Sequence, residues 1–372
     1  MQRSRPASIK SLLLLGAACV AIISAGPEEW ARADRPRLWA FPADHGAHPA
    51  FKTEWWYFTG VLADPDGRTF GYQLTFFRQG LRPAADDPAN AWSLRDAAMA
   101  HFTITDEAAG AFRSEDLLMR TGPGLAGWST TNLDVHVLGW SARLENGSIS
   151  LRASKGGLLL DLVLVPRKPP VLHGQDGLSR KGPASGESSY YSSWTDLDSK
   201  GAIVPAPGRA RVPVKGRSWF DHEFGSGMLS PDEAGWDWFS LHLSDGRDVM
   251  IYLLRRRDGS FEATSSGTMI ESDGRARPLA GTEIKIDVLD RWNSARSGGR
   301  YPSRWRIRLP GEDLDLEIRP IVRDQEVRAA SIPALVYWEG AVRGQGLSRG
   351  VAVAAEGYIE LTGYAGDLRR VF

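Results

Sequence analysis

The sequence has almost no cysteine and no excess of charge of either sign. Cys19 is the only cysteine among 372 residues, and it lies in the N-terminal segment. We therefore expect a mature chain without disulfides, thiolate catalysis or cysteine-bound zinc. The 45 basic residues equal the 45 acidic residues in number. This balance gives no reason to expect a nucleic-acid partner.

Motifs for nucleophilic and nucleotide chemistry are also missing. The sequence has no phosphate loop and no dinucleotide fingerprint, and the serine in residues 182–186 stands one place late for a G-x-S-x-G elbow. His45 and His48 lie three residues apart beside Asp44, but no third ligand follows at a known spacing, so no metal site is predicted. These histidines remain candidate acids or bases beside a pocket. The alternative is a polar loop held by hydrogen bonds at a barrel mouth.

Long stretches of helical periodicity are scarce, and residues 87–100 are the best helix candidate. The chain instead contains 40 glycines and 14 tryptophans, a composition typical of β-sheet with tight turns. Several short segments alternate in polarity or are continuously apolar, as strands do. The predicted strands are residues 54–59, 70–76, 133–137, 149–152, 158–165, 249–254, 284–288, 305–309 and 314–318.

The N-terminus has the pattern of a secretory signal peptide. Arg3, Arg5 and Lys10 precede an apolar run over residues 12–23, and residues 31–33 form an A-x-A cleavage site. We therefore expect residues 1–33 to be a signal peptide and the protein to be secreted or periplasmic. An uncleaved anchor is the alternative. A lipoprotein is less favoured, because the residues before Cys19 lack the usual large aliphatic side chain.

An internal duplication organises the rest of the chain, since four segments recur in the same order. The pairs are residues 55–58 with 236–239, 160–166 with 314–320, 191–194 with 337–339, and 219–221 with 358–360. Each half then reads as an antiparallel β unit that must hide its edges, as a barrel or a strongly curved sheet does. The predicted domains are residues 36–228 and 229–372. Residues 167–187 are predicted to be a long loop, a candidate lid.

Residues 216–225 carry the clearest chemical signal. On a strand, Trp219, Asp221 and Glu223 share one face, while the phenylalanines at 220 and 224 share the other. Burial among aromatics and a second nearby carboxylate both raise the pKa of a carboxyl group, which suits proton donation to an apolar substrate. Aromatic faces also stabilise a developing cation. The alternative is that both acids face water and only the phenylalanines pack.

Further acids and tryptophans stand among aromatic residues in the second half. Trp236 and Trp238 share a strand face, and Glu339 and Glu360 lie within aromatic segments. Such residues line pockets, but cores attract the same sequences, and a core strand is the simpler interpretation of the two tryptophans.

Three motifs together resemble the carotenoid 1,2-hydratase family, and more closely its secreted AttH-like branch, whose members are often labelled predicted hydrolases. They are F-P-A-D-H-G-A-H-P-A-F-K-T-E-W-W-Y-F-T-G at residues 41–60, S-W-F-D-H-E-F-G at 218–225, and Y-W-E-G with G-Y-I-E-L-T-G-Y at 337–340 and 357–364. The resemblance covers residues 36–372. It implies two tandem lipocalin-like β-barrel domains and a pocket for a large apolar ligand.

In the hydratases, a protein acid protonates a terminal carbon–carbon double bond and water captures the cation, without a cofactor. The resemblance places Asp221 at the acid position with Trp219 beside it. Where the hydratases carry a His-x-Trp segment, this chain keeps Trp194 but has Ser192 in place of the histidine. That departure argues against carotenoid hydration itself.

Three functions remain open. The first is a cofactor-free enzyme acting on an isoprenoid or lipid. The second is a carrier of such an apolar molecule, with a membrane exporter as a further partner, and the third is a secreted hydrolase. The candidate catalytic residues are Asp221, Glu223, His45 and His48. The candidate ligand-binding residues are Glu54, Trp56, Trp194, Trp219, Trp236, Trp238, Trp338, Glu339, Tyr358 and Glu360.

Overall fold

The computed structural model describes residues 29–83, 94–227, 230 and 232–366. Most of the predicted signal peptide therefore lies outside the described residues. Within the described part, no helix has the length and apolar character needed to span a membrane. The only helical elements there are three short 3-10 turns, η1 (Ala43–His45), η2 (Gly281–Glu283) and η3 (Pro310–Glu312).

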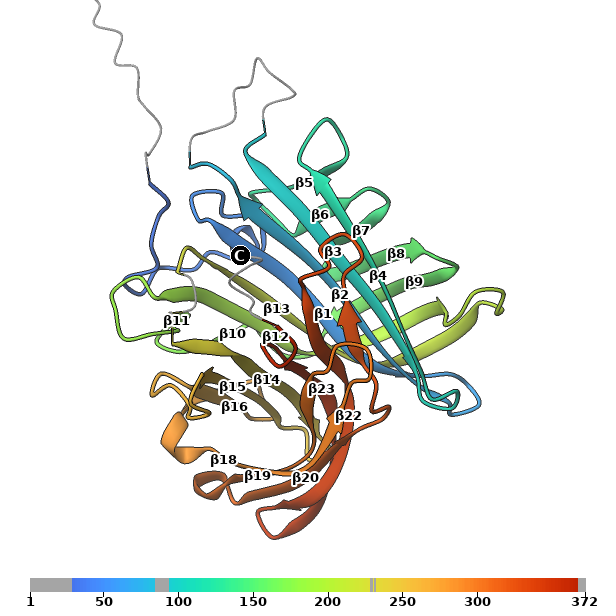
Figure 1. Cartoon of the computed structure of the whole chain (residues 1–372), viewed down its shortest axis with the longest axis vertical. Coiled ribbons are helices and arrows are strands. Elements are labelled where there is room, and N and C mark those ends of the chain that lie inside the picture. Colours follow the sequence, from blue (N-terminus) through green and yellow to red (C-terminus); the bar gives the residue numbers. More distant parts are fainter. Residues whose placement is uncertain (1–28, 84–93, 228–229, 231, 367–372) are drawn as a thin grey trace, which may run out of the picture.

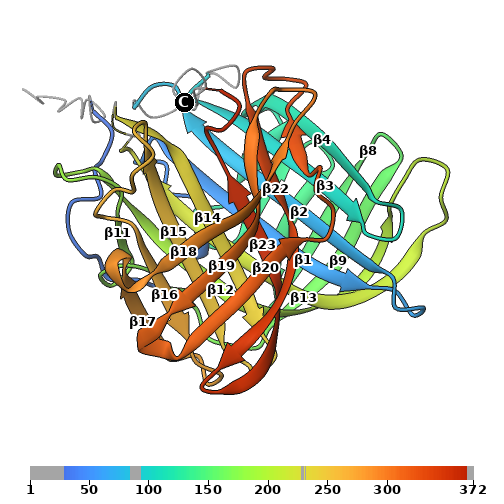
Figure 2. The same cartoon turned by 60° about the horizontal axis from the view of Figure 1, so that its bottom comes forward.

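Two curled antiparallel sheets make up the molecule (Figures 1 and 2). The first sheet contains β1 (Thr53–Ala63), β2 (Thr69–Gly80), β3 (Asp96–Asp106), β4 (Ala111–Arg120), β5 (Ala126–Trp128), β6 (Asp134–Val137), β7 (Trp140–Glu145), β8 (Ser148–Lys155), β9 (Leu158–Pro166), β10 (Val171–Leu172), β11 (Leu178–Arg180), β12 (Ser188–Val204) and β13 (Val212–Gly225). The second contains β14 (Glu233–Leu243), β15 (Asp248–Arg256), β16 (Ser266–Ile270), β17 (Ala276–Ala280), β18 (Lys285–Asn293), β19 (Arg300–Leu309), β20 (Leu314–Pro320), β21 (Glu326–Arg328), β22 (Val336–Ser348) and β23 (Val351–Leu361).

The order of strands repeats between the two sheets. It runs β4-β3-β2-β1-β13-β12-β9-β8 in the first and β17-β16-β15-β14-β23-β22-β20-β19 in the second. The four recurring sequence segments fall on equivalent strands, namely β1 with β14, β9 with β20, β12 with β22 and β13 with β23. The prediction of an all-β, duplicated, lipocalin-like fold is therefore confirmed, and every segment predicted as a strand overlaps one.

Each sheet curls around a core of its own side chains. Phe58, Phe102 and Trp140 are buried inside the first sheet, and Phe239 and Trp305 inside the second. The alternation of the strands explains this filling, because one face of each strand supplies the core while the other faces outward. The two interiors are therefore packed cores, and the outer faces of the strands are left to meet one another.

The outer faces of the two sheets pack together. Tyr57, Tyr191 and Trp219 of the first sheet share a buried cluster with Trp238 and Tyr252 of the second. Strands β1 and β2 contact β23 and β22, and in Figure 1 the orange-red strands lie against the blue ones. The rings of Tyr57 and Trp238 meet edge to face with centroids 5.1 Å apart. These two residues are equivalent in the duplication, so the halves meet at matching positions.

Two local predictions differ from the structure. The helix predicted over residues 87–100 is wrong for its described end, because β3 begins at Asp96 and pairs with β2 and β4. The remaining part of that prediction, residues 84–93, lies outside the described residues. The loop predicted over residues 167–187 contains β10 and β11, which both pair with β12. Long-range pairing outweighs local pattern in both places.

The contact between the sheets depends on a small residue in β2. A Cβ atom at Gly71 would lie 2.5 Å from the Cβ of Ala341 on β22, which is closer than packed carbons approach. We expect Gly71→Ala to lower the free energy of unfolding by about 1–3 kcal/mol through overpacking. Urea denaturation followed by tryptophan fluorescence measures this. The control is Gly139→Ala, whose added Cβ meets open space. A Gly71→Ala protein as stable as the control would contradict the close packing.

Candidate functional site

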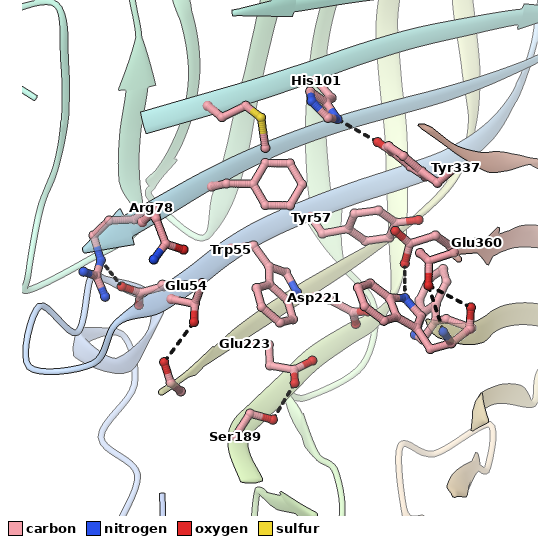
Figure 3. A pocket seen from close by; sticks show the side chains of 18 of the residues that line it. Glu54, Trp55, Tyr57, Arg78, His101, Ser189, Asp221, Glu223, Tyr337 and Glu360 are labelled. Carbon is pink, nitrogen blue, oxygen red and sulfur yellow. Dashed lines mark hydrogen bonds and ion pairs between the residues drawn. The ribbon is translucent and has the colours of Figure 1, made fainter. Parts of the chain in front are cut away.

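A cavity of about 350 Å³ lies between the outer faces of the two sheets. Strands β1, β2, β3, β12 and β13 line it from one side, and β14, β15, β22 and β23 from the other. Its walls are largely apolar and include several aromatic rings, with Trp55, Tyr57 and Trp236 among them. Carboxyl groups from both sheets interrupt this surface (Figure 3). Apolar walls with a few placed polar groups are typical of small-molecule sites.

Asp221 on β13 is hydrogen-bonded by three side chains. It is 3 % exposed and accepts hydrogen bonds from the Tyr191 hydroxyl (2.6 Å), Trp219 Nε1 (2.6 Å) and the Ser193 hydroxyl. Trp238 Nε1 in turn donates to the Tyr191 oxygen at 3.0 Å. Burial outweighs these donors and raises the pKa of Asp221 to about 7. A buried carboxyl that holds its proton near neutrality, facing an apolar cavity, is what a general acid requires.

A buried histidine contacts Asp221 indirectly, through Ser193. His173 Nε2 lies 2.7 Å from the Ser193 hydroxyl, and its Nδ1 lies 2.8 Å from the Thr268 hydroxyl on the second sheet. Burial lowers the pKa of His173 to about 3, so the ring is neutral. Because Ser193 donates to Asp221, the consistent arrangement has Nε2–H donating to Ser193 and Nδ1 accepting from Thr268. The chain thereby holds Ser193 in the orientation that Asp221 needs.

Glu223 has a different environment although it shares the strand face of Asp221. Its carboxylate accepts a hydrogen bond from the Ser189 hydroxyl and lies 2.8 Å from the Lys181 ammonium. Lys181 also sits 3.9 Å from the centre of the Tyr252 ring. An ammonium thus pairs with Glu223, whereas neutral donors surround Asp221, so the two acids of this strand have different surroundings.

A second pair of acids comes from the other sheet. Glu339 on β22 and Glu360 on β23 are direct cross-strand neighbours. Glu360 accepts a hydrogen bond from Trp236 Nε1 at 2.7 Å, whereas neither oxygen of the fully buried Glu339 has a partner among the described residues. Burial, reinforced by the charge of Glu360, raises the pKa of Glu339 well above its usual range, and the nearby hydroxyls of Tyr57 and Tyr337 offset this only in part. Burial also raises the pKa of Glu360, to about 7.

At one end of the cavity, Glu54 is the centre of a buried ion network. It lies 3.0 Å from His48 Nδ1, 2.9 Å from His222 Nε2 and 3.0 Å from Arg78 Nε. Burial alone would raise the pKa of Glu54, but the two histidines and the Arg78 charge hold it well below its usual range. His48, Glu54 and His222 converge closely enough to suggest a cation site. However, Arg78 already neutralises the carboxylate and both facing ring nitrogens bond to it, so the donor set fits an internal network better than a metal.

The structure gathers seven of the fourteen candidate residues at this cavity. Those that line it are Glu54, Asp221, Glu223, Trp236, Trp238, Glu339 and Glu360. Trp56 and Trp194 belong to the core of the first sheet, and Trp338 to that of the second. Trp219 and Tyr358 are packed between the sheets outside the lining. Which of these residues act on a ligand stays a prediction.

The two candidate histidines of the N-terminal segment also lie outside the lining. His45 is 2 % exposed, and its ring packs against Trp194 with centroids 4.1 Å apart. Burial lowers its pKa to about 3. His48 bonds to Glu54 and stacks on Phe224. These contacts agree with the alternative interpretation of this segment as a loop held by hydrogen bonds.

Several residues at the site were not foreseen from the sequence. Tyr191 and Ser193 share the strand face opposite to that of Trp194, and Tyr191 recurs as Tyr337 in the second half, so this face was a usable signal. His173 and Lys181 come from a Gly- and Pro-rich stretch without periodicity, where no local pattern marks them. The pairing of β10 and β11 with β12 brings Lys181 to the cavity and His173 to Ser193.

Asp221 makes stability depend on pH in a defined direction. The folded protein holds this proton up to a pKa of about 7, whereas an unfolded Asp releases it at about 4. Stability contributed by this group is therefore full below pH 4 and falls as the pH rises towards 7. We expect Asp221→Asn to remove that loss. Between pH 4 and pH 8, the free energy of unfolding of the variant should therefore fall less than that of the wild type, by on the order of a few kcal/mol.

Urea denaturation at both pH values measures the difference between wild type and Asp221→Asn. The matched control is Asp198→Asn, an exposed position on β12. Equal pH dependence in the wild type and Asp221→Asn would contradict the raised pKa.

Comparisons with known proteins agree with this architecture. The AttH-like family model matches residues 32–364. A crystal structure of an AttH protein from Nitrosomonas europaea superposes with a TM-score of 0.80 at 32% identity, covering 90% of this chain and 99% of that one. No curated protein matches the chain in sequence.

Two more distant structures share the fold. Kievitone hydratase from Nectria haematococca has a TM-score of 0.68 at 13% identity, covering 92% of this chain and 98% of that one. CghA in complex with Sch210972 has a TM-score of 0.52 at 13% identity, covering 91% and 98%. At such identity the likeness concerns the fold alone. The family match and the Nitrosomonas structure together establish that this chain belongs to the AttH-like family.

Proposed function

We propose that the protein is a cofactor-free, hydratase-like enzyme that adds water across a carbon–carbon double bond of an apolar isoprenoid or lipid, with Asp221 as the general acid. One observation carries this proposal. Asp221 is a buried carboxyl that faces an aromatic cavity and has a pKa near 7. A carboxyl in this state can give up a proton to a carbon atom that no ordinary exposed carboxylate would protonate at neutral pH.

The chemistry requires no other reagent than water. Protonated Asp221 forms a C–H bond as the π bond of the alkene breaks, which leaves a cation on the adjacent carbon and a carboxylate at Asp221. The rings of Trp55, Tyr57 and Trp236 offer negative faces to that cation. Water then forms the C–O bond and loses a proton. The fold shared with kievitone hydratase supports this reaction class by analogy, as does the resemblance to carotenoid hydratases.

The size of the cavity bears on the ligand. A volume of about 350 Å³ lies at the lower end of the usual range for small-molecule sites, which is roughly 300–1,000 Å³. This favours a compact unsaturated molecule over a full-length carotenoid. We retain secretion to the periplasm or beyond as part of the proposal, on the N-terminal sequence pattern alone.

A carrier function is the second candidate, and the apolar lining of the cavity favours it. In that case the protein would hold an isoprenoid or lipid unchanged and deliver it to a membrane exporter. The hydrolase alternative has less support. It requires an activated water or nucleophile, for which the sequence offers only scattered acids and His45, His48 and His222. None of these three histidines is among the described residues that line the cavity.

Ligand recovery followed by an isotope assay separates these functions. The mature protein is purified from its host, its ligand is identified by native mass spectrometry and extraction, and unsaturated candidates of that class are incubated in oxygen-18 water. We expect one oxygen-18 atom in the product and a loss of turnover of about 100-fold or more in Asp221→Asn, since that variant cannot donate the proton.

Asp198→Asn again serves as the control, because its exposed side chain lies away from the cavity. Hydration by Asp221→Asn at the wild-type rate would contradict the proposed acid. Recovery of a stoichiometric ligand that the wild type never alters would instead establish the carrier.

A further inference from the structure

The duplication places a second carboxyl centre opposite the first. In the first half, Ser193 on β12 is the cross-strand neighbour of Asp221 on β13. In the second half, the equivalent strands β22 and β23 bring Glu339 beside Glu360. A carboxyl group therefore occupies the position at which the first half has a hydrogen-bond donor. The two centres come from different sheets and face the same cavity (Figure 3).

That exchange leaves the second centre short of donors. Three donors hold Asp221, whereas Trp236 is the one described hydrogen-bond donor to Glu360. Both oxygens of Glu339 and the hydroxyl of Tyr57 are buried without a hydrogen bond of normal geometry among the described residues. The hydroxyls of Tyr57 and Tyr337 lie near enough to lower the pKa of Glu339, but neither completes such a bond. Glu339, Glu360 and Tyr57 all line the cavity. Buried acceptors without well-formed bonds are costly unless a water or a ligand hydroxyl supplies them.

We propose that Glu339 and Glu360 together form the proton-accepting base of the hydration, which binds the attacking water and takes its proton while Asp221 acts from the opposite sheet. This inference rests on the proposed function and extends it to the second half of the reaction. It also assigns a position to the water, next to the unpartnered oxygens of Glu339.

The groups around the pair explain why it holds a proton. Tyr57 from β1, Tyr337 from β22 and Trp236 from β14 are neutral neighbours, and Asp221 and Glu223 from β13 are acids. None of these named groups is a cation. Two buried carboxyl groups side by side cannot both ionise, so the pair shares one proton and keeps the capacity for a second.

The reaction balances on this arrangement. Asp221 gives its proton to one alkene carbon and becomes a carboxylate. The water oxygen bonds to the other carbon, and its surplus proton passes to the Glu339–Glu360 pair. Asp221 is close enough to raise the pKa of Glu360, so its new negative charge strengthens the base just when the water must be deprotonated. After the product leaves, water in the cavity returns the proton to Asp221.

Infrared spectroscopy tests the shared proton without any substrate. We expect the ligand-free protein to show a protonated carboxyl band at neutral pH that persists in Asp221→Asn and changes in frequency and intensity when Glu339→Gln is added. Glu317→Gln is the control, because Glu317 lies on β20 of the same sheet but pairs with Arg304 at the surface. Unaltered carboxyl bands in both Glu339→Gln and Glu360→Gln, each folded by circular dichroism, would overturn the inference.

Deuterium uptake then separates the two steps on the compound that the wild type hydrates. In heavy water we expect Glu339→Gln to keep exchanging deuterium into the alkene while its hydration falls about 100-fold, in the range typical for loss of a general base. Asp221→Asn should lose both. Hydration by Glu339→Gln at the wild-type rate would refute the base and leave the acid intact, whereas retention of both steps by Asp221→Asn would refute the proposed function.

Discussion

Removal of carboxyl groups from water between two packed sheets is the constraint on which the site depends. Asp221 comes from the first sheet and Glu339 from the second, and both are buried at the cavity between the two sheets. Tyr57 and Trp238, one from each sheet, meet edge to face in the same interface. Both halves therefore contribute to removing these acids from water. The duplication therefore creates the chemical environment as well as the fold.

This environment carries a cost in stability, because an unfolded chain ionises the same acids freely in water. The cost is offset elsewhere in the molecule. Each sheet encloses an apolar core of its own, with Phe58 and Trp140 in one and Phe239 and Trp305 in the other. Buried acids of this molecule also differ in how many of their hydrogen bonds are made. The Glu54 network is well satisfied, whereas the oxygens of Glu339 are left unpartnered at the cavity. Such local violations are typical of functional sites in otherwise consistent proteins.

Much of the fold could be predicted from the sequence, because period-two alternation and four recurring segments mark the strands and their order. The sequence could not show which face of each strand points towards the cavity. The pattern at Trp219, Asp221 and Glu223 shows that they share a side, but only the second sheet determines that this side faces a cavity. For the same reason Trp56 and Trp194 could not be distinguished from Trp236 and Trp238. All four tryptophans lie in similar aromatic strand segments, yet the first two fill a core and the other two line the cavity.

The unforeseen residues show a second limit. His173 reaches Ser193 from a stretch without periodicity, through pairing between strands distant in sequence. The described end of the helix predicted over residues 87–100 is wrong for a related reason, since it belongs to β3 and pairs with residues of β2 and β4 that lie well away in sequence. Local sequence patterns can thus identify the acids of this site, but not the groups that position them.

The most direct test of the account is a carbon-13 NMR titration of the Asp221 carboxyl in the folded protein, assigned by comparison with Asp221→Asn. We expect this carboxyl to titrate near pH 7, because burial between the sheets disfavours its charge. Titration near pH 4, as in an exposed aspartate, would contradict it. In that case Asp221 would carry no proton to donate at neutral pH.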